Sequence, residues 1–451
     1  MKTYVDTGPD QPRRRHLAGL ASLFGLGLAG GTRRVWAQSA PAGGLKSPAG
    51  DGRLVVVFLR GACDGLSAFV PYADAHYHAI RPTIAIAPPD GTLQTALRLD
   101  ATFALHPALG ALLPLWQQGV LSFVPAAGLP MPNRSHFDAQ YQMEIGRTGK
   151  TSGAPGWLNS AAAQAGAGGA ATLALGVGEA NPAILYGPAA VKLIARGQAA
   201  ERTGVLANDT TRRALLDLYA GNDRLGAAFR QGAGSRLQSA QELGAEKMTP
   251  GSERSLEQGG APADGQMRSA QMAAASNGAA DPVGLQLDAR HLGTLMRNDR
   301  QLRLGFLSAG GWDTHANQGA VTGQLANNLG NLGRGIGQLR QDFSRPRDVI
   351  VVMSEFGRTS AENGTRGTDH GFGNALWLVG NRINGGRWHG EWSGLSQGNL
   401  NEGRDLPAHH DYRAVLAQVL RGALALDDAA LAQVLPGAPW DRRLDGLLRP
   451  T

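Results

Sequence analysis

Short apolar runs and longer amphipathic stretches alternate along most of the chain. The apolar runs are rich in β-branched residues, which is typical of strands that are buried on both faces. The predicted strands are Leu54–Leu59, Leu121–Val124, Thr172–Leu175, Leu302–Leu307, Val349–Met353 and Ala375–Val379. Because helical patterns separate them, we predict an α/β fold in which helices cover both faces of a mainly parallel central sheet.

One helix is predicted ahead of the strand that begins at Val349. Its apolar residues recur at spacings of four, three, four and three: Leu325, Leu329, Leu332, Ile336 and Leu339. These spacings place the side chains on one face of a helix. A stripe of this kind indicates a core helix, and a helix that binds a partner is the alternative.

A segment from about residue 232 to residue 281 differs in composition from the rest. It is rich in Gly, Ser, Ala, Gln and Glu and contains no aromatic residue. Such a composition buries too little apolar surface to order itself, at least in its middle. We interpret residues 232–281 as a flexible insertion, either a mobile lid or a linker, within a single domain that spans residues 38–451.

The first 37 residues have the organisation of an export signal. Three arginines at positions 13–15 precede an apolar stretch at 18–29, and a small-residue cleavage site follows at 35–37. This order is typical of a signal peptide. The paired arginines indicate the twin-arginine type, with His16 where a phenylalanine is usual. We predict that residues 1–37 are a twin-arginine signal peptide and that the protein is periplasmic or secreted; a disordered basic tail is the alternative.

Removal of this segment changes what the charge implies. The whole chain has a net charge of +7, and residues 1–37 contain six basic and two acidic side chains, so the remainder carries +3. No basic stripe interleaved with aromatic residues remains, and nucleic acid is not an expected partner. A single cysteine, Cys63, excludes an internal disulfide. No other apolar stretch is long enough to predict a membrane span in the mature protein.

An aspartate and a histidine lie just past one of the predicted strands. The apolar run Leu302–Leu307 leads into the sequence GGWDTH, residues 310–315. In open α/β sheets ligands collect at the carboxyl ends of the strands. A carboxylate and an imidazole two residues apart on a glycine-rich loop can bind one divalent metal. Asp313 and His315 are therefore candidate metal ligands, although Asp-x-His also occurs in turns without a ligand.

Other segments repeat this placement of polar groups after strands. Asp64 follows the first strand between two glycines, where it is a candidate ligand or an Asp-Gly residue that caps the next helix. Glu355 follows the strand at Val349, and a buried carboxylate there is costly unless it is paired or bound to metal. Asp369 and His370 are adjacent between glycines. Asp64, Glu355, Asp369 and His370 thus join the candidate metal ligands.

Two further residues are candidates for catalysis. Ser135 begins a predicted helix, as an N-cap or as a hydroxyl nucleophile activated by a metal. Arg358 pairs with Glu355 or clamps the oxygens of a phosphate or sulfate. The chain contains no G-x-S-x-G sequence, so a serine hydrolase with a nucleophile elbow is not expected. Cys63 has no basic neighbour in sequence and is interpreted as a small buried residue.

Several motifs occur together in one order along the chain. After the export arginines come LVVVFLRGACDGL, SHFDAQ, GWLN, GGWDTHANQG, VVMSEFGRT and GTDHGFGNA. In this the chain resembles a bacterial family of exported proteins of no established function, which is grouped with the alkaline phosphatase and sulfatase-like superfamily. The resemblance covers nearly all of the mature chain. It implies a three-layer α/β/α sandwich and descent from metal-dependent hydrolases of phosphate or sulfate esters.

The resemblance also implies roles for particular residues. Asp64 would hold one metal and Ser135 would be the nucleophile, while Asp313 and His315 would hold the other metal. His370 matches a final histidine ligand. An Asp-His pair is usual after a later strand, and here Glu355 and Phe356 stand in its place. Phe356 cannot bind a metal, so one of the two sites lacks a ligand unless Asp369 substitutes, and a single metal, a different metal or an inactive descendant all stay open.

The function expected from these residues is that of an exported hydrolase of a phosphate or sulfate ester that uses a divalent metal, namely zinc, calcium or magnesium. Its partners would be a small anionic ester or glycan and the twin-arginine export machinery. The alternative is a non-catalytic exported protein that binds an anionic glycan or a protein partner with a degenerate metal pocket. A purely structural envelope component is a third hypothesis.

Overall fold

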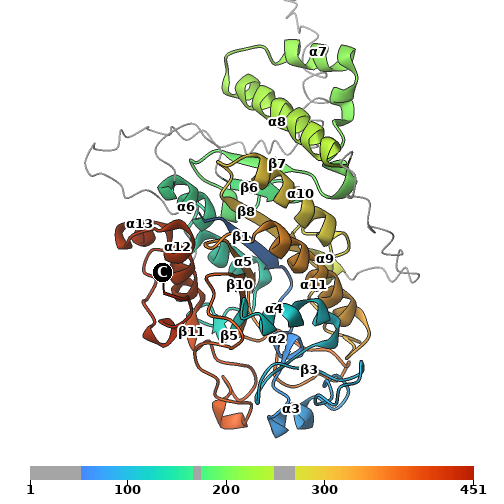
Figure 1. Cartoon of the computed structure of the whole chain (residues 1–451), viewed down its shortest axis with the longest axis vertical. Coiled ribbons are helices and arrows are strands. Elements are labelled where there is room, and N and C mark those ends of the chain that lie inside the picture. The colour runs from blue at the N-terminus through green and yellow to red at the C-terminus, as the bar shows by residue number, and fades with distance from the viewer. Residues whose placement is uncertain (1–51, 150, 166–173, 248–269, 451) are drawn as a thin grey trace, which may run out of the picture.

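The computed structural model describes residues 52–149, 151–165, 174–247 and 270–450. Its central sheet has the strand order β11-β5-β10-β9-β1-β8-β6-β7 (Figure 1). The strands of this sheet are β1 (Leu54–Leu59), β5 (Leu121–Gly128), β6 (Ala174–Val177), β7 (Val191–Ile194), β8 (Leu304–Ala309), β9 (Val349–Ser354), β10 (Asn374–Gly380) and β11 (His410–Asp411). Each pairing is parallel except the two made by β10, which runs antiparallel to β5 and β9. The mainly parallel sheet predicted from the sequence is confirmed.

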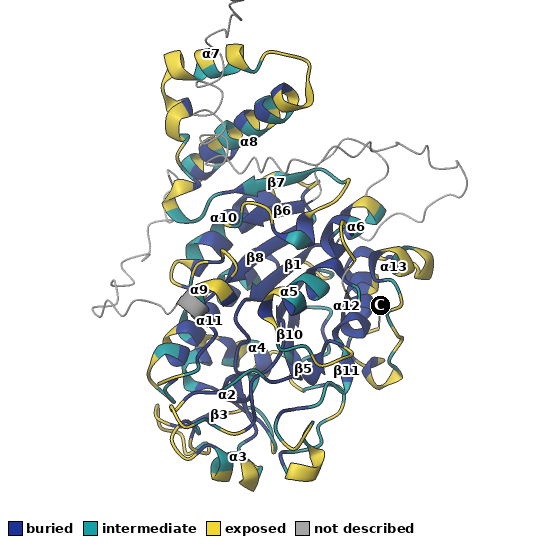
Figure 2. Ribbon diagram, turned by 180° about the vertical axis from the view of Figure 1, so that it is seen from behind, coloured by how far each residue is buried: buried dark blue, intermediate teal, exposed yellow. Residues whose placement is uncertain are grey.

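Helices cover both faces of this sheet. One layer consists of α5 (His136–Ile145), α6 (Trp157–Ala165), α12 (Tyr412–Leu424) and α13 (Asp428–Val434). The other contains α4 (Leu113–Gln117), α10 (Leu285–Asn298) and α11 (Gln324–Asp342). Successive side chains of β1 contact alternate layers, because neighbouring residues of a strand point to opposite faces. The result is the predicted three-layer α/β/α sandwich, with the fully buried strands at its centre (Figure 2).

The pattern-based elements agree closely with the structure where burial is complete. β1 has the predicted bounds, and all six of its residues are buried. The apolar stripe of α11 is buried in the core beside α10, which confirms it as a core helix. The strands that the pattern did not predict lie at the two edges of the sheet: β7 is only partly buried, and β11 has two residues. Edge strands this short or this exposed lack a distinctive apolar run.

A smaller unit lies below β5 and α4 at the bottom of Figure 1. It contains the helices α2 (Gly65–Ala68) and α3 (Ala75–Ile80) and a second sheet of β2 (Phe69–Val70), β4 (Ala104–Leu105) and β3 (Leu97–Arg98). Some of its apolar residues form a cluster of their own around Leu66, Val70 and Tyr77, whereas Phe69 and Leu105 join the core beneath the central sheet. This unit follows directly from β1, so it stays packed against the end of that strand.

The two ends of the predicted insertion, residues 232–281, are helical. Helix α8 (Arg224–Lys247) forms the first end. Together with α7 (Asp209–Leu218), which precedes the insertion, it projects beyond the edge of the sheet at the top of Figure 1, and the two helices share a small core around Phe229. Helix α9 (Ala270–Ala275) forms the other end. Residues 248–269, the middle of the insertion, lie outside the described residues. Composition did not predict α8, because its described part within the insertion has few buried apolar residues, namely Ala233, Ala240 and Leu243.

The predicted signal peptide, residues 1–37, also lies outside the described residues. Within the ranges that the structure does describe, no helix combines the length and the apolar character needed to cross a membrane.

The burial of Cys63 leads to a testable prediction. Its side chain is 2% exposed, and burial raises the pKa of the thiol well above its usual value, with the charges of Asp64 and Glu355 adding to the effect. Only the thiolate reacts quickly with thiol reagents. We therefore predict negligible labelling of the native protein by a chromogenic disulfide reagent, and one thiol labelled per chain in guanidinium. Native labelling at the rate of free cysteine would contradict this.

Candidate metal centre

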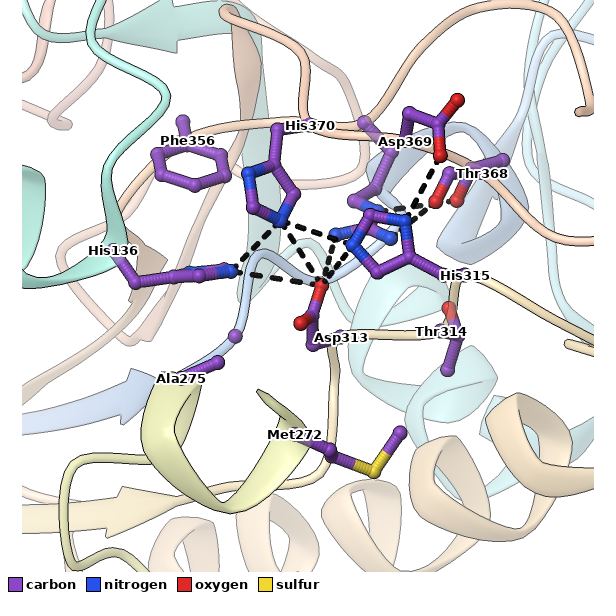
Figure 3. A network of polar contacts seen from close by, with 12 residues as sticks. His136, Met272, Ala275, Asp313, Thr314, His315, Phe356, Thr368, Asp369 and His370 are labelled. Carbon is purple, nitrogen blue, oxygen red and sulfur yellow. Dashed lines mark hydrogen bonds and ion pairs between the residues drawn. The ribbon is translucent and has the colours of Figure 1, made fainter. Parts of the chain in front are cut away.

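The candidate site lies at the carboxyl ends of neighbouring parallel strands. Asp313 and His315 follow β8, Glu355 follows β9, and His370 precedes β10. The first residue of α5, His136, completes the group from the helix layer (Figure 3). β8 and β9 flank β1 in the sheet, so the loops after them meet at one edge.

Three ligand atoms converge on one point, and a fourth, from His315, lies beside two of them. Nε2 of His370 lies 2.9 Å from Nε2 of His136 and 3.1 Å from Nε2 of His315. Oδ1 of Asp313 lies 2.9 Å from Nε2 of His315, 3.2 Å from that of His370 and 3.5 Å from that of His136. The ligand atoms of His136, Asp313 and His370 all lie within 4.8 Å of one another, so these residues could hold a metal ion.

The other ring nitrogen of each histidine faces an oxygen. The distances from Nδ1 are 2.8 Å to Glu355 Oε1 for His136, 2.9 Å to Asp369 Oδ1 for His315, and 2.9 Å to the Arg134 carbonyl for His370. An ionised carboxylate and a carbonyl accept hydrogen bonds but donate none, so Nδ1 carries a proton. Nε2 is then left either with a lone pair for a metal or with a second proton that it donates to Asp313. Lone pairs at these distances repel unless a cation lies among them. The arrangement therefore fits a metal or a shared proton.

Asp313 is held as an anion with one oxygen unused. Arg358 Nη1 donates to Oδ1 at 2.7 Å, whereas Oδ2 is buried and has no hydrogen-bond partner within the described ranges. Burial opposes ionisation of this carboxyl. Hydrogen bonds from the three histidines and the charge of Arg358 nevertheless lower its pKa. A buried acceptor without a partner costs about 1–3 kcal/mol, and a bound cation would supply the missing partner.

The negative charge around His136 favours any cation at this point. Burial opposes protonation of its ring, but the hydrogen bonds and charges of Asp313 and Glu355 outweigh that effect and raise the pKa of His136 to about 9. The hydrogen bond that His315 donates to Asp313 is also the main cause that raises the pKa of His315. Without a metal, these groups hold a proton that a divalent ion would displace.

Glu355 and Asp369, predicted as ligands, lie behind the histidines instead of facing the common point. Oε1 of Glu355 accepts from His136, from Gln140 Nε2 at 2.9 Å and from the Gly61 amide at 2.8 Å. Such carboxylates orient a metal-binding histidine and raise its basicity. The close approach needs glycine at position 61, since its φ is 112° and a Cβ would lie 2.9 Å from the Asp313 amide nitrogen.

Asp64 is not brought to the cluster. Its carboxylate pairs with Arg81 at 2.7 Å and 3.1 Å and also accepts from Ser67 and Gln318. Asp64 and Arg81 are 1% and 0% exposed, so the oxygens that would bind a metal are used in a buried ion pair. The prediction of Asp64 as a ligand is therefore not supported. Arg81 follows 17 residues later, and no local sequence pattern links the two.

Ser135 and Arg358, the two predicted catalytic residues, do not have the surroundings that a nucleophile and an anion clamp need. Ser135 is the exposed N-cap residue of α5, and its side chain makes no capping hydrogen bond. Arg358 is 2% exposed. Besides Asp313, its guanidinium donates to both the hydroxyl and the carbonyl of Thr368. Arg358 therefore positions Asp313 and has few donors left for a substrate anion.

Phe356, which occupies the place of a usual histidine, forms an apolar wall. Its ring centroid lies 4.9 Å from that of His136 and 5.2 Å from that of His370. The side chain is 2% exposed. It limits the rotation of both imidazoles and excludes water from one side of the cluster (Figure 3).

Sequence reasoning identified Ser135 and overlooked the residue beside it. His136 is 8% exposed and contributes a ligand atom, whereas Ser135 faces solvent. The available signal was a histidine at the start of a helix that follows a strand, which is the same placement that singled out His315. A capping serine next to it has a simple local explanation, and that explanation drew attention away from the histidine.

The Asp64–Arg81 pair gives a stability prediction. Burial opposes ionisation of Asp64, but the charge and hydrogen bonds of Arg81 outweigh it and lower its pKa. The pair therefore stabilises the fold above the unfolded-state pKa of about 3.9, and this contribution is lost as the pH falls through the folded value. At neutral pH, Arg81→Met leaves a buried charge and should lower the free energy of unfolding in urea by about 3–5 kcal/mol.

The exposed arginine of β3 provides the control for this measurement. Arg98 donates to the Tyr72 hydroxyl at the surface, so Arg98→Met should change stability by only about 0.5 kcal/mol. A change as small as about 0.5 kcal/mol for Arg81→Met as well would show that the buried pair does not stabilise the fold.

One family model matches most of the chain. Residues 51–435 match the model of a family described as "Protein of unknown function (DUF1501)". No curated protein matches the chain. The family match includes every residue of the metal cluster and most of the sequence, and the chain therefore belongs to this family of proteins of unknown function, DUF1501.

Proposed function

We propose that the protein is an exported, metal-dependent hydrolase of a phosphate or sulfate ester. The observation that carries this proposal is the convergence of His136, Asp313 and His370 on one point. The side chains of His315 and His370 are 31% and 20% exposed, so a small ester can approach from their side. The resemblance to the alkaline phosphatase and sulfatase-like superfamily, carried by the sequence motifs, supports the same reaction class.

The donor set favours zinc over the other metals expected from the sequence. Imidazole nitrogens suit zinc and other transition metals, whereas calcium and magnesium prefer oxygen ligands throughout. With Asp64 engaged by Arg81 and Phe356 apolar, the described residues supply donors for a single metal. We therefore propose one zinc ion in place of the pair that is usual in the superfamily.

Each residue of the centre then has a definite task. His136, Asp313 and His370 would hold the zinc, which would supply Lewis acidity and lower the pKa of a water molecule. Glu355, Asp369 and the Arg134 carbonyl hold the three imidazoles in the tautomer that presents Nε2. Arg358 keeps Asp313 ionised and aimed at the histidines. We assign the nucleophile to water, because Ser135 is exposed and lies outside the convergent set.

One observation favours a second candidate function, a non-catalytic protein that binds metal. Nε2 of His315 lies beside this group, 3.1 Å from Nε2 of His370 and 2.9 Å from Oδ1 of Asp313, and could supply a fourth ligand. Four protein ligands complete the tetrahedral coordination of a structural zinc, whereas catalytic sites usually keep one position open. A closed site of this kind would serve binding of an anionic glycan or a protein partner.

The metal content of protein purified after native export tests both functions. We predict about one zinc per chain by mass spectrometry, with turnover on a panel of phosphate and sulfate esters. Asp313→Asn removes the anionic ligand, so both metal and turnover should be lost. Asp217→Asn, on the exposed surface of α7, is the matched control and should retain both.

The outcomes separate the candidates. Stoichiometric zinc without turnover on any ester would favour the binding protein. Protein that has never met a chelator and still contains no metal would contradict both functions.

The carboxylate behind His136 gives an independent prediction. Glu355→Gln removes the charge that orients the imidazole, and zinc affinity should fall about 10- to 100-fold in competition with a chromophoric chelator. Glu391→Gln, whose side chain is 46% exposed, is the control. An unchanged affinity in Glu355→Gln would argue that His136 does not bind the metal.

A further inference from the structure

The end of the predicted insertion packs closely against the loop that leads to the metal centre. Residues 275–280 begin at the last residue of α9 and approach Gly310, the first residue of that loop. A Cβ at Gly310 would lie 2.6 Å from the Ser276 hydroxyl oxygen and 2.7 Å from the Ala279 carbonyl oxygen. The Gly310 amide also donates to the Ala280 carbonyl at 2.7 Å. The first glycine of the GGWDTH sequence is therefore required by this close approach.

The second glycine of the same sequence is held from two sides. The Gly311 amide donates to Ser276 Oγ at 3.1 Å, and Asn328 Nδ2 of α11 donates to the Gly311 carbonyl at 2.8 Å. Ser276 Oγ in turn donates to the Met272 carbonyl at 2.9 Å. Ser276 and Asn328 are 3% and 8% exposed. Buried polar groups that satisfy one another have little freedom to move, so the path of the chain is set two residues before Asp313.

A second set of contacts runs from α9 to His136. Gln140, on α5, is fully buried, and its Nε2 donates to the Ala275 carbonyl at 2.7 Å and to Glu355 Oε1 at 2.9 Å. Oε1 of Glu355 also lies 2.8 Å from His136 Nδ1. An amide nitrogen of this kind has two protons. One of them binds the end of α9, and the other holds the carboxylate that orients a metal ligand.

These contacts place α9 on the covered side of the metal centre. Figure 3 shows Met272 and Ala275 of α9 below Asp313, and His370 lies above it in the same view. Ala275 and Asp313 are 2% and 3% exposed, whereas the side chain of His370 is 20% exposed. The centre is therefore closed on the side of α9 and accessible on the side of His370.

We propose that residues 275–280 are a positioning element of the metal centre, in which Ser276 fixes the loop that leads to Asp313. The segment belongs to the predicted insertion, residues 232–281, and a linker would need none of these buried contacts. The binding of zinc by the positioned ligands rests on the proposed function.

Ser276→Ala tests the positioning role through the metal. Loss of the hydroxyl leaves the Gly311 amide without its acceptor, so the loop before Asp313 should loosen. Zinc affinity should fall about threefold to tenfold in competition with a chelator, which is less than for loss of a group that touches the ligand itself. The visible absorption of the cobalt-substituted protein should also change, because it depends on the arrangement of ligands around the metal.

Ser239→Ala is the matched control. Ser239 is fully buried in α8, and its Oγ donates to the Ser235 carbonyl, just as Ser276 Oγ donates to the Met272 carbonyl. Both substitutions remove a hydrogen bond between residues four apart, and each should lower the midpoint of thermal unfolding by on the order of 2 °C. Only Ser276→Ala should change the cobalt spectrum and the zinc affinity. Unchanged metal binding in Ser276→Ala would overturn the proposal.

Asn328→Ala separates the contribution of the insertion from that of α11. It removes the other hydrogen bond to Gly311 and should change the cobalt spectrum as Ser276→Ala does. An effect of Asn328→Ala without an effect of Ser276→Ala would assign the positioning to α11 alone and overturn the role of residues 275–280.

NMR spectra of the metal-free protein separate this role from the proposed function. The ring-proton resonances of His315 and His370, which contact Asp313, should shift in Ser276→Ala and not in Ser239→Ala. Wild-type protein that takes up neither zinc nor cobalt would contradict the proposed function, and the resonances would then decide the positioning role by themselves. Resonances that stay unchanged in Ser276→Ala would overturn it.

Discussion

The carboxylate of Asp313 is buried at the edge of the sheet, between one guanidinium and three imidazoles. Burial of a charge of this kind is costly unless other groups compensate for it. Arg358 satisfies Oδ1, the histidines crowd around the same oxygen, and Oδ2 has no partner in the part of the chain that the structure describes. The local structure is thus organised around a negative charge that is only partly compensated.

The surrounding residues make sense as supports for that arrangement. Nδ1 of each histidine faces an oxygen that fixes the ring. Two of these oxygens belong to Glu355 and Asp369, the carboxylates that the sequence alone suggested as metal ligands. Phe356 restricts two of the rings from one side. Gly61 lets the loop after β1 come close enough for its amide to bind Glu355. These contacts cost side-chain freedom, and they are the kind that hold ligands ready for a metal.

Two other buried ion pairs lie outside the centre. Asp64 is paired with Arg81 in the unit that follows β1, and Arg60 is paired with Glu144 and Glu179. Three arginines, including Arg358, thus compensate carboxylates along one edge of the sheet. Only at Asp313 do convergent histidines accompany the pair, which is why that position and not Asp64 supports a metal site.

Local pattern was sufficient for the layers of the fold and for the sheet edge at which polar groups gather. β1 and α11 have clear apolar patterns because a buried strand and a core helix bury their residues with a fixed period. Asp313, His315 and His370 were found because each lies beside a strand. Their partners were decided by tertiary structure. His136 reaches His370 only because segments 234 residues apart pack together. Arg81 reaches Asp64, 17 residues away, only through the folding of the unit that follows β1. Side-chain direction at a loop depends on such packing, and a sequence pattern records only where each residue stands along the chain.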